Sequence, residues 1–88
     1  MTESKFIKAE ELFREMLREL RQTKELTQAQ VAQRLGLPQS YVSKYETGER
    51  RLDFVETVFV CEALGVSLDE FVKTFTAKLA SRGRRKRD

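Results

Sequence analysis

The residues from Gln39 to Thr47 place short hydrogen-bonding side chains on one side of a predicted helix. In a helix of about 3.6 residues per turn, Val42 and Tyr45 fall on the opposite side, which we expect to face the core. The outward side has no carboxylate and consists of hydroxyl, amide and ammonium groups: Gln39, Ser40, Ser43, Lys44 and Thr47. Such groups can donate to and accept from base edges in a DNA major groove about 12 Å wide, which admits one helix. The alternative is a helix side that only meets solvent.

The preceding segment favours the first of these interpretations. Thr27 and Gln30 have the spacing of a capping box, which predicts that a helix starts after Thr27. Gln28 then lies at the helix N-terminus, where free backbone N–H groups and the helix dipole favour a phosphate. Ala32 is small enough to let two helices cross closely, and the short link "GLP" forces a sharp angle between them. This layout predicts a helix-turn-helix, with the first helix crossing the DNA backbone and the second entering the groove.

The distribution of charge points to a polyanionic partner. The chain has 88 residues and a net charge of +3. Residues 27–51 carry four positive and two negative charges, and residues 82–88 carry five and one. The rest of the chain is neutral or acidic, so the positive charge is localised. Double-stranded DNA is the partner we expect.

Several functional classes are disfavoured by what the sequence lacks. It has no histidine and a single cysteine, so we expect no intramolecular disulfide, no metal site of the Cys/His kind and no cofactor. The sequence also lacks a Ser-His pair, a Cys-His pair and a phosphate-binding glycine loop, so we do not expect an enzyme. No apolar run is long enough for a signal peptide or a membrane span, so we expect a cytoplasmic protein. Cys61 lies in an apolar stretch, and we interpret it as a core residue, with a redox sensor as the alternative.

Apolar residues recur at spacings of three and four, which predicts an all-α fold. Capping residues and glycines divide the chain into five predicted helices, which start near residues 4, 28, 38 or 39, 53 and 67 and end near residues 24, 36, 48, 65 and 81. Residues 1–81 are expected to form one domain. Residues 82–88, RGRRKRD, are expected to be a disordered basic tail, which either attracts DNA phosphates or only increases solubility.

Two longer stretches, LTQAQVAQRLGLPQSYVSKYETGERRLD and CEALGVSLDEF, closely resemble the Cro/C1-type helix-turn-helix family, also called XRE-like. The resemblance covers about residues 11–72. It implies a compact five-helix bundle of the lambda-repressor-like kind. The family includes phage repressors, small bacterial regulators, controller proteins of restriction–modification systems and some antitoxins, so the chain is expected in a prokaryotic cell or a phage.

The resemblance also assigns roles to individual residues. The positions that usually read bases are occupied by Gln39, Ser40 and Lys44, with Ser43 beside them. Gln28 matches a phosphate-contacting position. The loop after the second helix commonly contacts phosphates, which implicates Thr47, Arg50 and Arg51. Pro38 stands where the family more often has a Ser or Thr cap, so the start of this helix is less well defined.

Glu46 points near the predicted core, where an unpaired carboxylate is costly. Arg21 lies one turn after Leu17 on the first helix, from where its side chain can reach Glu46. We therefore predict an Arg21–Glu46 salt bridge, a pairing that the resembled family often has. The alternative is that Glu46 is solvated.

The fourth predicted helix has more apolar residues than one core-facing stripe needs. Val55 and Phe59 form a second apolar face, and with Phe75 of the fifth helix we interpret it as a dimer patch. Alternatively, the start of the first helix, around Phe6 and Ile7, folds back to cover it.

These observations predict a sequence-specific, double-stranded-DNA-binding transcriptional regulator, such as a repressor, that acts as a homodimer on a palindromic operator. The alternative is an antitoxin-like interaction module, which binds a partner protein through its fourth and fifth helices and binds DNA only secondarily.

Overall fold

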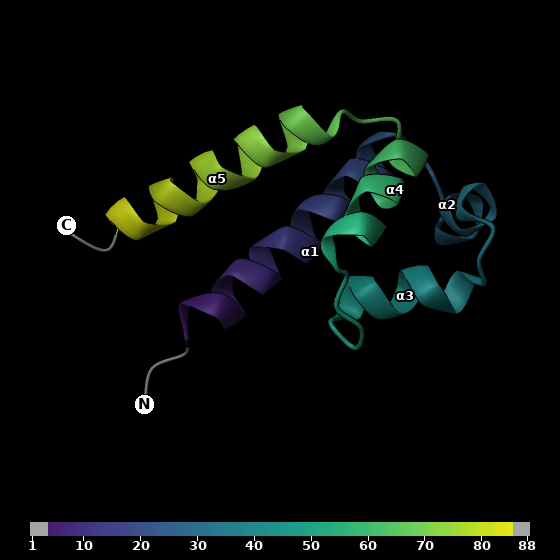
Figure 1. Ribbon diagram of the computed structural model, residues 1–88, viewed down its shortest axis with the longest axis horizontal. Helices are drawn as coiled ribbons and strands as arrows, with labels where there is room; N and C mark the ends of the chain where they lie inside the picture. Colours follow the sequence, from purple (N-terminus) through teal and green to yellow (C-terminus); the bar gives the residue numbers. More distant parts are fainter. Residues whose placement is uncertain (1–3, 86–88) are drawn as a thin grey trace.

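The computed structural model describes residues 4–85, with side chains described as far as Arg82, and these residues form five α-helices without a strand. The all-α prediction is confirmed. In Figure 1, α1 and α5 lie alongside each other and project beyond the three shorter helices. The helices are α1 (Lys5–Thr23), α2 (Gln28–Leu35), α3 (Gln39–Thr47), α4 (Phe54–Leu64) and α5 (Leu68–Arg85).

The helix boundaries follow from local capping chemistry. The predicted capping box at Thr27 is present, and α4 starts with a second one: the Thr27 hydroxyl accepts from the Gln30 backbone N–H, and the Asp53 carboxylate accepts from that of Glu56. At each box the side chain of the third residue also accepts from the backbone N–H of the cap. These exchanges satisfy backbone donors that a helix start otherwise leaves unpaired. They fix where α2 and α4 begin.

The turn between α2 and α3 is short because α2 ends in a left-handed residue. Gly36 has φ of 72°, and the backbone N–H of Leu37 donates to the Ala32 carbonyl at 3.0 Å. A residue with a Cβ is disfavoured in this conformation, whereas glycine adopts it readily. Pro38 then takes the cap position of α3 without a side-chain hydrogen bond. The turn directs α3 away from α2 at a sharp angle, as Figure 1 shows.

The core draws residues from all five helices. Fully or almost fully buried side chains include Leu12, Met16, Leu17, Val31, Ala32, Val42, Tyr45, Val60, Cys61, Leu64 and Phe71. Phe13 completes this cluster through edge-to-face contacts with Phe71 and Phe75, at centroid distances of 5.8 and 6.1 Å. One expectation was wrong. The start of the first helix, around Phe6, was the alternative cover for the apolar face of α4, yet 71% of Phe6 is exposed because the start of α1 projects past the core.

The last helix is longer than the sequence suggested. Residues 82–88 were expected to be a disordered tail, but α5 continues to Arg85, four residues past that boundary. Gly83 alone costs only about 1 kcal/mol in a helix, and the Arg82 guanidinium lies 3.4 Å from the Glu15 carboxylate of α1. The remaining three residues of the predicted tail, 86–88, lie outside the described part of the chain.

No helix in the described range, residues 4–85, has the length and apolar character needed to cross a membrane.

Glu46 of α3 is buried with only 7% of its surface exposed, and its carboxylate is paired. Arg21 of α1 donates to it twice, from Nε at 2.7 Å and from Nη2 at 3.1 Å. The same guanidinium donates to the Leu26 carbonyl at 2.9 Å, so it also holds the α1–α2 turn. The hydrogen bond to Glu46 raises the pKa of Arg21 above its usual value. The pair therefore joins α1 to α3 across the edge of the core.

Replacing Arg21 with Ala should lower the free energy of unfolding by about 3–5 kcal/mol, because it leaves Glu46 as a buried charge without a cation. Urea denaturation followed by circular dichroism measures this. The matched control is Arg18→Ala, one turn earlier on the exposed side of α1, which should change the value by less than about 0.5 kcal/mol. Equal stability of both variants would contradict a structural role for the pair.

Burial raises the pKa of the Cys61 thiol to about 11. Because the thiolate is the reactive form, we expect a maleimide at pH 7.5 to label the folded protein at least about a hundredfold more slowly than the urea-unfolded protein. Rapid labelling of the folded protein would favour a redox-sensing cysteine instead.

Candidate nucleic-acid interface

Helix α3 has a buried side and a polar side. Val42 and Tyr45 are buried in the core, and Tyr45 is so far removed from water that the pKa of its hydroxyl is raised. On the opposite side, Gln39, Ser40, Lys44 and Thr47 are exposed, whereas Ser43 is half-buried. The core thus fixes the rotation of α3 about its own axis. Four of the five polar side chains singled out in the sequence are accessible to a ligand.

The two glutamines implicated in DNA contact lie next to each other. Gln28 Nε2 donates to Glu46 Oε1 at 2.9 Å, and Gln39 Nε2 donates to Gln28 Oε1 at 3.4 Å. Sequence reasoning assigned Gln28 to a phosphate and did not anticipate its bond to Glu46. The only signal was that a buried carboxylate accepts more hydrogen bonds than one guanidinium supplies. Each amide nitrogen has a second N–H that these two bonds do not use.

The α3–α4 loop begins at Gly48, whose φ of 92° ends the helix. The Thr47 hydroxyl donates to the Lys44 carbonyl at 3.2 Å and can still accept a hydrogen bond. Sequence reasoning missed Arg14, which approaches this loop from α1: a Cβ on Gly48 would lie 2.9 Å from Arg14 Cζ. Its cation lies near the C-terminal end of α3, where the helix dipole favours positive charge. Nothing in the local sequence around Arg14 indicates this position.

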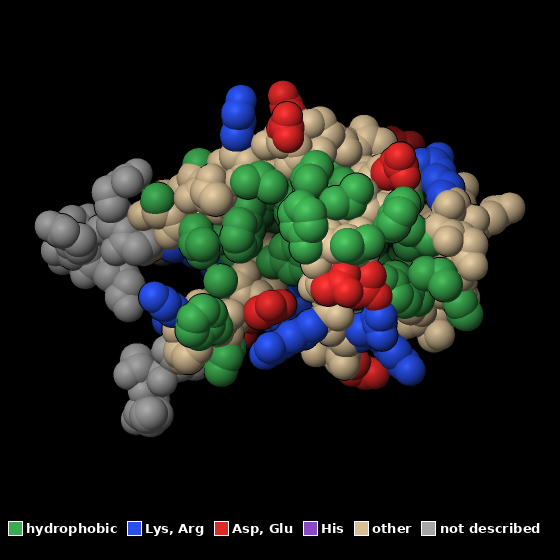
Figure 2. Space-filling model, viewed as in Figure 1, with side chains coloured by type: hydrophobic (Ala, Val, Ile, Leu, Met, Phe, Trp, Pro, Cys, Tyr) green, Lys and Arg blue, Asp and Glu red, His purple; other side chains and the backbone are tan. Residues whose placement is uncertain are grey.

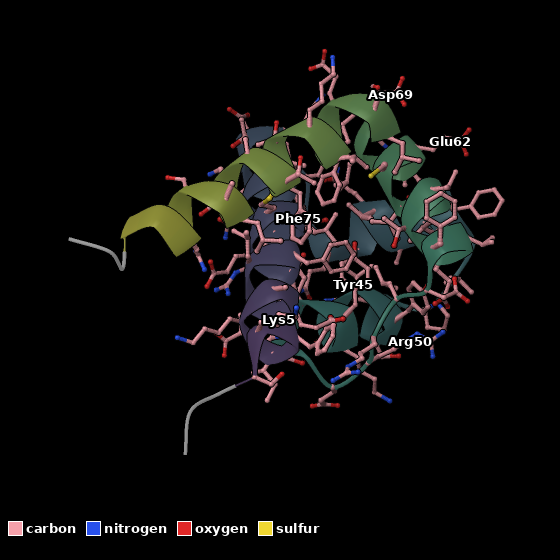
Figure 3. All side chains as sticks on the ribbon, turned by 60° about the vertical axis from the view of Figure 1, so that its left-hand side comes forward. Lys5, Tyr45, Arg50, Glu62, Asp69 and Phe75 are labelled. Atoms are coloured by element: carbon pink, nitrogen blue, oxygen red, sulfur yellow. The ribbon has the colours of Figure 1, made fainter. Side chains whose placement is uncertain are left out.

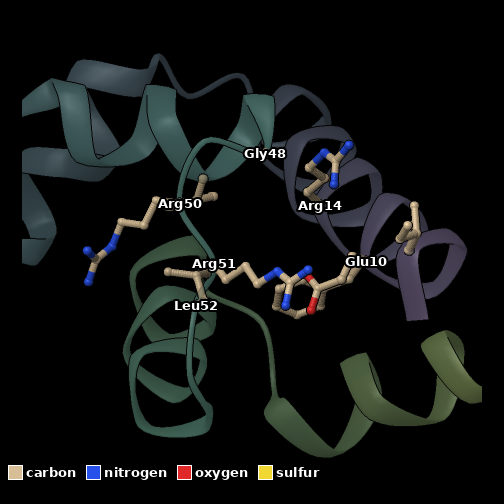
Figure 4. Close-up of a pocket in the computed structure, with 9 residues that line it drawn as sticks. Glu10, Arg14, Gly48, Arg50, Arg51 and Leu52 are labelled. Carbon is tan, nitrogen blue, oxygen red and sulfur yellow. The ribbon is translucent and has the colours of Figure 1, made fainter. Parts of the chain in front are cut away.

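Arg50 and Arg51 are adjacent in sequence but differ in surroundings. Arg50 donates to Glu56 of α4, and its guanidinium carbon lies 4.9 Å from the centroid of the Tyr41 ring. Arg51 is exposed and points toward Glu10 of α1, away from Arg50 (Figure 4). The two arginines were given the same role from the sequence. Of the two, Arg50 alone forms an ion pair in the described chain, with the Glu56 carboxylate.

The predicted dimer patch divides into two parts. Val55 and Phe59 of α4 are 60% and 54% exposed, on a face where hydrophobic side chains gather (Figure 2). Phe75 instead lies between α5 and α1 (Figure 3), half-buried against Phe13 and Phe71. The tight packing of these three aromatic rings explains why Phe75 does not join the α4 face.

The start of α1 does not cover this face. Phe6 lines a different groove, with a volume of about 430 Å³, together with Phe54 of α4 and Val72 of α5. The hollow beside Phe59 is lined by Arg34, Leu35, Glu62 and Ala63. Within the described chain, Val55 and Phe59 therefore remain open to a partner.

No group of three or more acidic, cysteine or histidine side chains among the described residues could hold a metal ion. The polar face of α3, the start of α2 and the α3–α4 loop are the features that can contact an extended polyanion.

Comparison with known proteins places these features in a family. Residues 17–71, which run from α1 to α5, match the family model described as helix-turn-helix. The chain is 36% identical over 62 residues to the uncharacterized HTH-type transcriptional regulator YqaE of Bacillus subtilis (strain 168), covering 70% of this chain. It spans about half of that relative, 53% of its length.

Two solved structures share the fold. An XRE-family like protein from Pseudomonas syringae pv. tomato str. DC3000 has a TM-score of 0.80 and 34% identity, with 83% of this chain and 89% of that chain covered. The clp gene regulator ClgR from Corynebacterium glutamicum has a TM-score of 0.73 at 23% identity, with 89% and 83% covered, and supports the fold alone. The family match, the 34%-identical structure and the order of the five helices agree: the chain belongs to the Cro/C1-type, XRE-like helix-turn-helix family.

Proposed function

We propose that this protein is a sequence-specific, double-stranded-DNA-binding transcriptional regulator that acts as a homodimer on a palindromic operator. The observation that carries the proposal is the orientation of α3. Its polar side faces outward because Val42 and Tyr45 are buried on the other side. A helix presented in this way fits the major groove. The name of the Bacillus subtilis relative, an HTH-type transcriptional regulator, agrees with this function.

In this proposal the polar groups divide into two classes. Base edges are read by the side chains along the outward face of α3: Gln39, Ser40, Ser43 and Lys44. Phosphates are contacted by the start of α2, through Gln28 and the free N–H groups there, and by the α3–α4 loop, through Thr47 and Arg51; the family resemblance assigns Arg50 to the same class. Base contacts specify the sequence, whereas phosphate contacts set position and supply affinity that depends on salt.

A homodimer is supported by the exposed apolar face of α4, formed by Val55 and Phe59. A single recognition helix reads only a few base pairs. Two copies related by a two-fold axis read half-sites about 34 Å apart, which is one turn of DNA. Burying the apolar face between the copies also removes Phe59 from water.

The same face favours a second candidate function, binding to a different protein in the manner of an antitoxin. Val55 and Phe59 are each more than half exposed, so another polypeptide could cover them as well as a second copy of this chain. Mass measurement of the complex purified from its native cell separates the two functions. A second polypeptide in stoichiometric amount favours the partner protein, and a mass of two copies favours the homodimer.

Selection of bound duplexes from a random DNA library should enrich a palindrome, because a two-fold dimer imposes its symmetry on the site. On the enriched duplex, Lys44→Ala should lose affinity by about 1–3 kcal/mol and change base preference. Arg51→Ala should weaken binding to all duplexes alike and reduce the slope of log affinity against log salt by about one. Both variants are measured by fluorescence anisotropy against salt.

Glu49→Ala is the matched control within the same loop, since it removes a carboxylate that cannot attract a phosphate; it should not reduce the salt slope. Equal losses on enriched and random duplexes for Lys44→Ala would contradict its role in base reading.

Phe59→Asp should shift the protein toward monomers in analytical ultracentrifugation, because it places a charge in the proposed interface. Ile7→Asp, an equally drastic change at an exposed apolar residue outside the α4 face, should leave the mass unchanged. A wild-type protein that stays monomeric at high micromolar concentration would refute the α4 dimer.

A further inference from the structure

The carboxylate of Glu56, in the first turn of α4, collects donors from three parts of the chain. Its Oε2 accepts from the Tyr41 hydroxyl of α3 at 3.1 Å and from Arg50 Nη2 of the loop. Its Oε1 accepts from the backbone N–H of Asp53 at 2.9 Å. The Arg50 guanidinium in turn lies over the Tyr41 ring. We call this set Tyr41, Arg50 and Glu56 the loop clamp.

The loop clamp closes the segment between α3 and α4. Tyr41 lies in the first turn of α3, and Glu56 lies three residues after the cap of α4, so the two side chains span the whole loop. The Arg50 backbone N–H donates to the Lys44 carbonyl at 3.1 Å, which folds the loop back onto the end of α3. Main chain and side chain of Arg50 therefore both hold the loop.

The charges within the clamp are matched. The hydrogen bond from the Asp53 backbone and the ion pair with Arg50 lower the pKa of Glu56, and the bond to Glu56 raises the pKa of Arg50. Both groups are thus ionised at neutral pH. If Arg50 left Glu56 to contact a DNA phosphate, the Glu56 carboxylate would lose its cation close to a polyanion, and like charges repel. Figure 4 shows that Arg51 extends in another direction, toward Glu10 of α1.

We propose that Arg50 is a positioning residue: the loop clamp uses its guanidinium to order the α3–α4 loop and to set α3 relative to α4, and Arg50 keeps this contact when DNA binds. The proposal rests on the proposed DNA-binding function and revises the role given to Arg50 there. The phosphate contact of the loop then falls to Arg51 and to the backbone N–H groups. Arg50 acts on DNA only through the conformation of the loop.

The first experiment needs no DNA. Amide hydrogen exchange is followed by NMR in the wild type and in Arg50→Gln, Glu56→Gln and Arg51→Gln. The Gln at position 56 keeps the capping box of α4, so the helix itself should persist. If the clamp orders the loop, the backbone N–H of residue 50 should exchange with solvent about tenfold faster than in the wild type in both Arg50→Gln and Glu56→Gln. Its exchange rate should not change in Arg51→Gln. Exchange within twofold of wild type in the two clamp variants would overturn the proposal.

The second experiment measures affinity for the enriched duplex against salt. A phosphate contact contributes about 0.9 to the slope of log affinity against log salt. Arg50→Gln should weaken binding with an unchanged slope, whereas Arg51→Gln should reduce the slope by about 0.9. A reduced slope in Arg50→Gln, or tighter binding of random duplexes by Glu56→Gln through a released arginine, would overturn the proposal. Thermal unfolding of each variant confirms that the folded state is compared.

The two experiments fail separately. A wild-type protein that ignores all duplexes would refute the proposed function, while the exchange data would still decide whether the loop clamp orders the loop.

Discussion

The buried carboxylate of Glu46 constrains how the first three helices assemble. An ionised carboxylate is costly to remove from water unless cations and hydrogen-bond donors replace the lost hydration. Here Arg21 of α1 supplies two donors and Gln28 of α2 supplies a third. Helices α1 and α2 must therefore both approach α3 at Glu46. Through Gln28, the hydrogen bonds continue to the exposed Gln39 on the candidate DNA-binding surface.

The candidate interface depends on two kinds of positioning. The core residues Val42 and Tyr45 fix which side of α3 faces outward, and the left-handed Gly36 fixes the direction in which the helix leaves the turn. The first turn of α3 is held by the hydrogen bond from the Tyr41 hydroxyl to Glu56, and its end is held by the short loop that begins at Gly48. The outward side chains of α3 contribute little to fixing the position of the helix.

Much of the fold could be predicted because it is encoded locally. Capping boxes at Thr27 and Asp53 and left-handed glycines mark the helix ends within a few residues of sequence. The contact between Arg21 and Glu46 could also be predicted from the sequence, because a carboxylate on the core side of a helix requires a partner. The solvent exposure of Phe6 could not be predicted from the sequence, because it depends on how far α1 projects beyond its neighbours. Nor could the length of α5 be predicted, because residues 82–88 have no apolar side chain to dock and were expected to be a disordered tail.

The candidate site was only partly predictable for a similar reason. The outward face of α3 follows from periodicity, but the roles of Arg50 and Arg51 depend on which way two adjacent loop side chains turn. The direction of the Arg50 side chain is set by Tyr41 of α3 and Glu56 of α4, which lie on either side of the loop in the sequence. No sequence motif links these two residues to the loop. Likewise, Arg14 comes from another helix altogether.

The central claim is that the outward side of α3 lies against base pairs. The most direct measurement is NMR of the isotopically labelled protein as an enriched duplex is added, with side-chain contacts to the DNA recorded as intermolecular nuclear Overhauser effects. Our account predicts contacts from Gln39, Ser40 and Lys44 to base protons in the major groove. Contacts that instead cluster on α4 or α5, with the α3 side chains unperturbed, would contradict it.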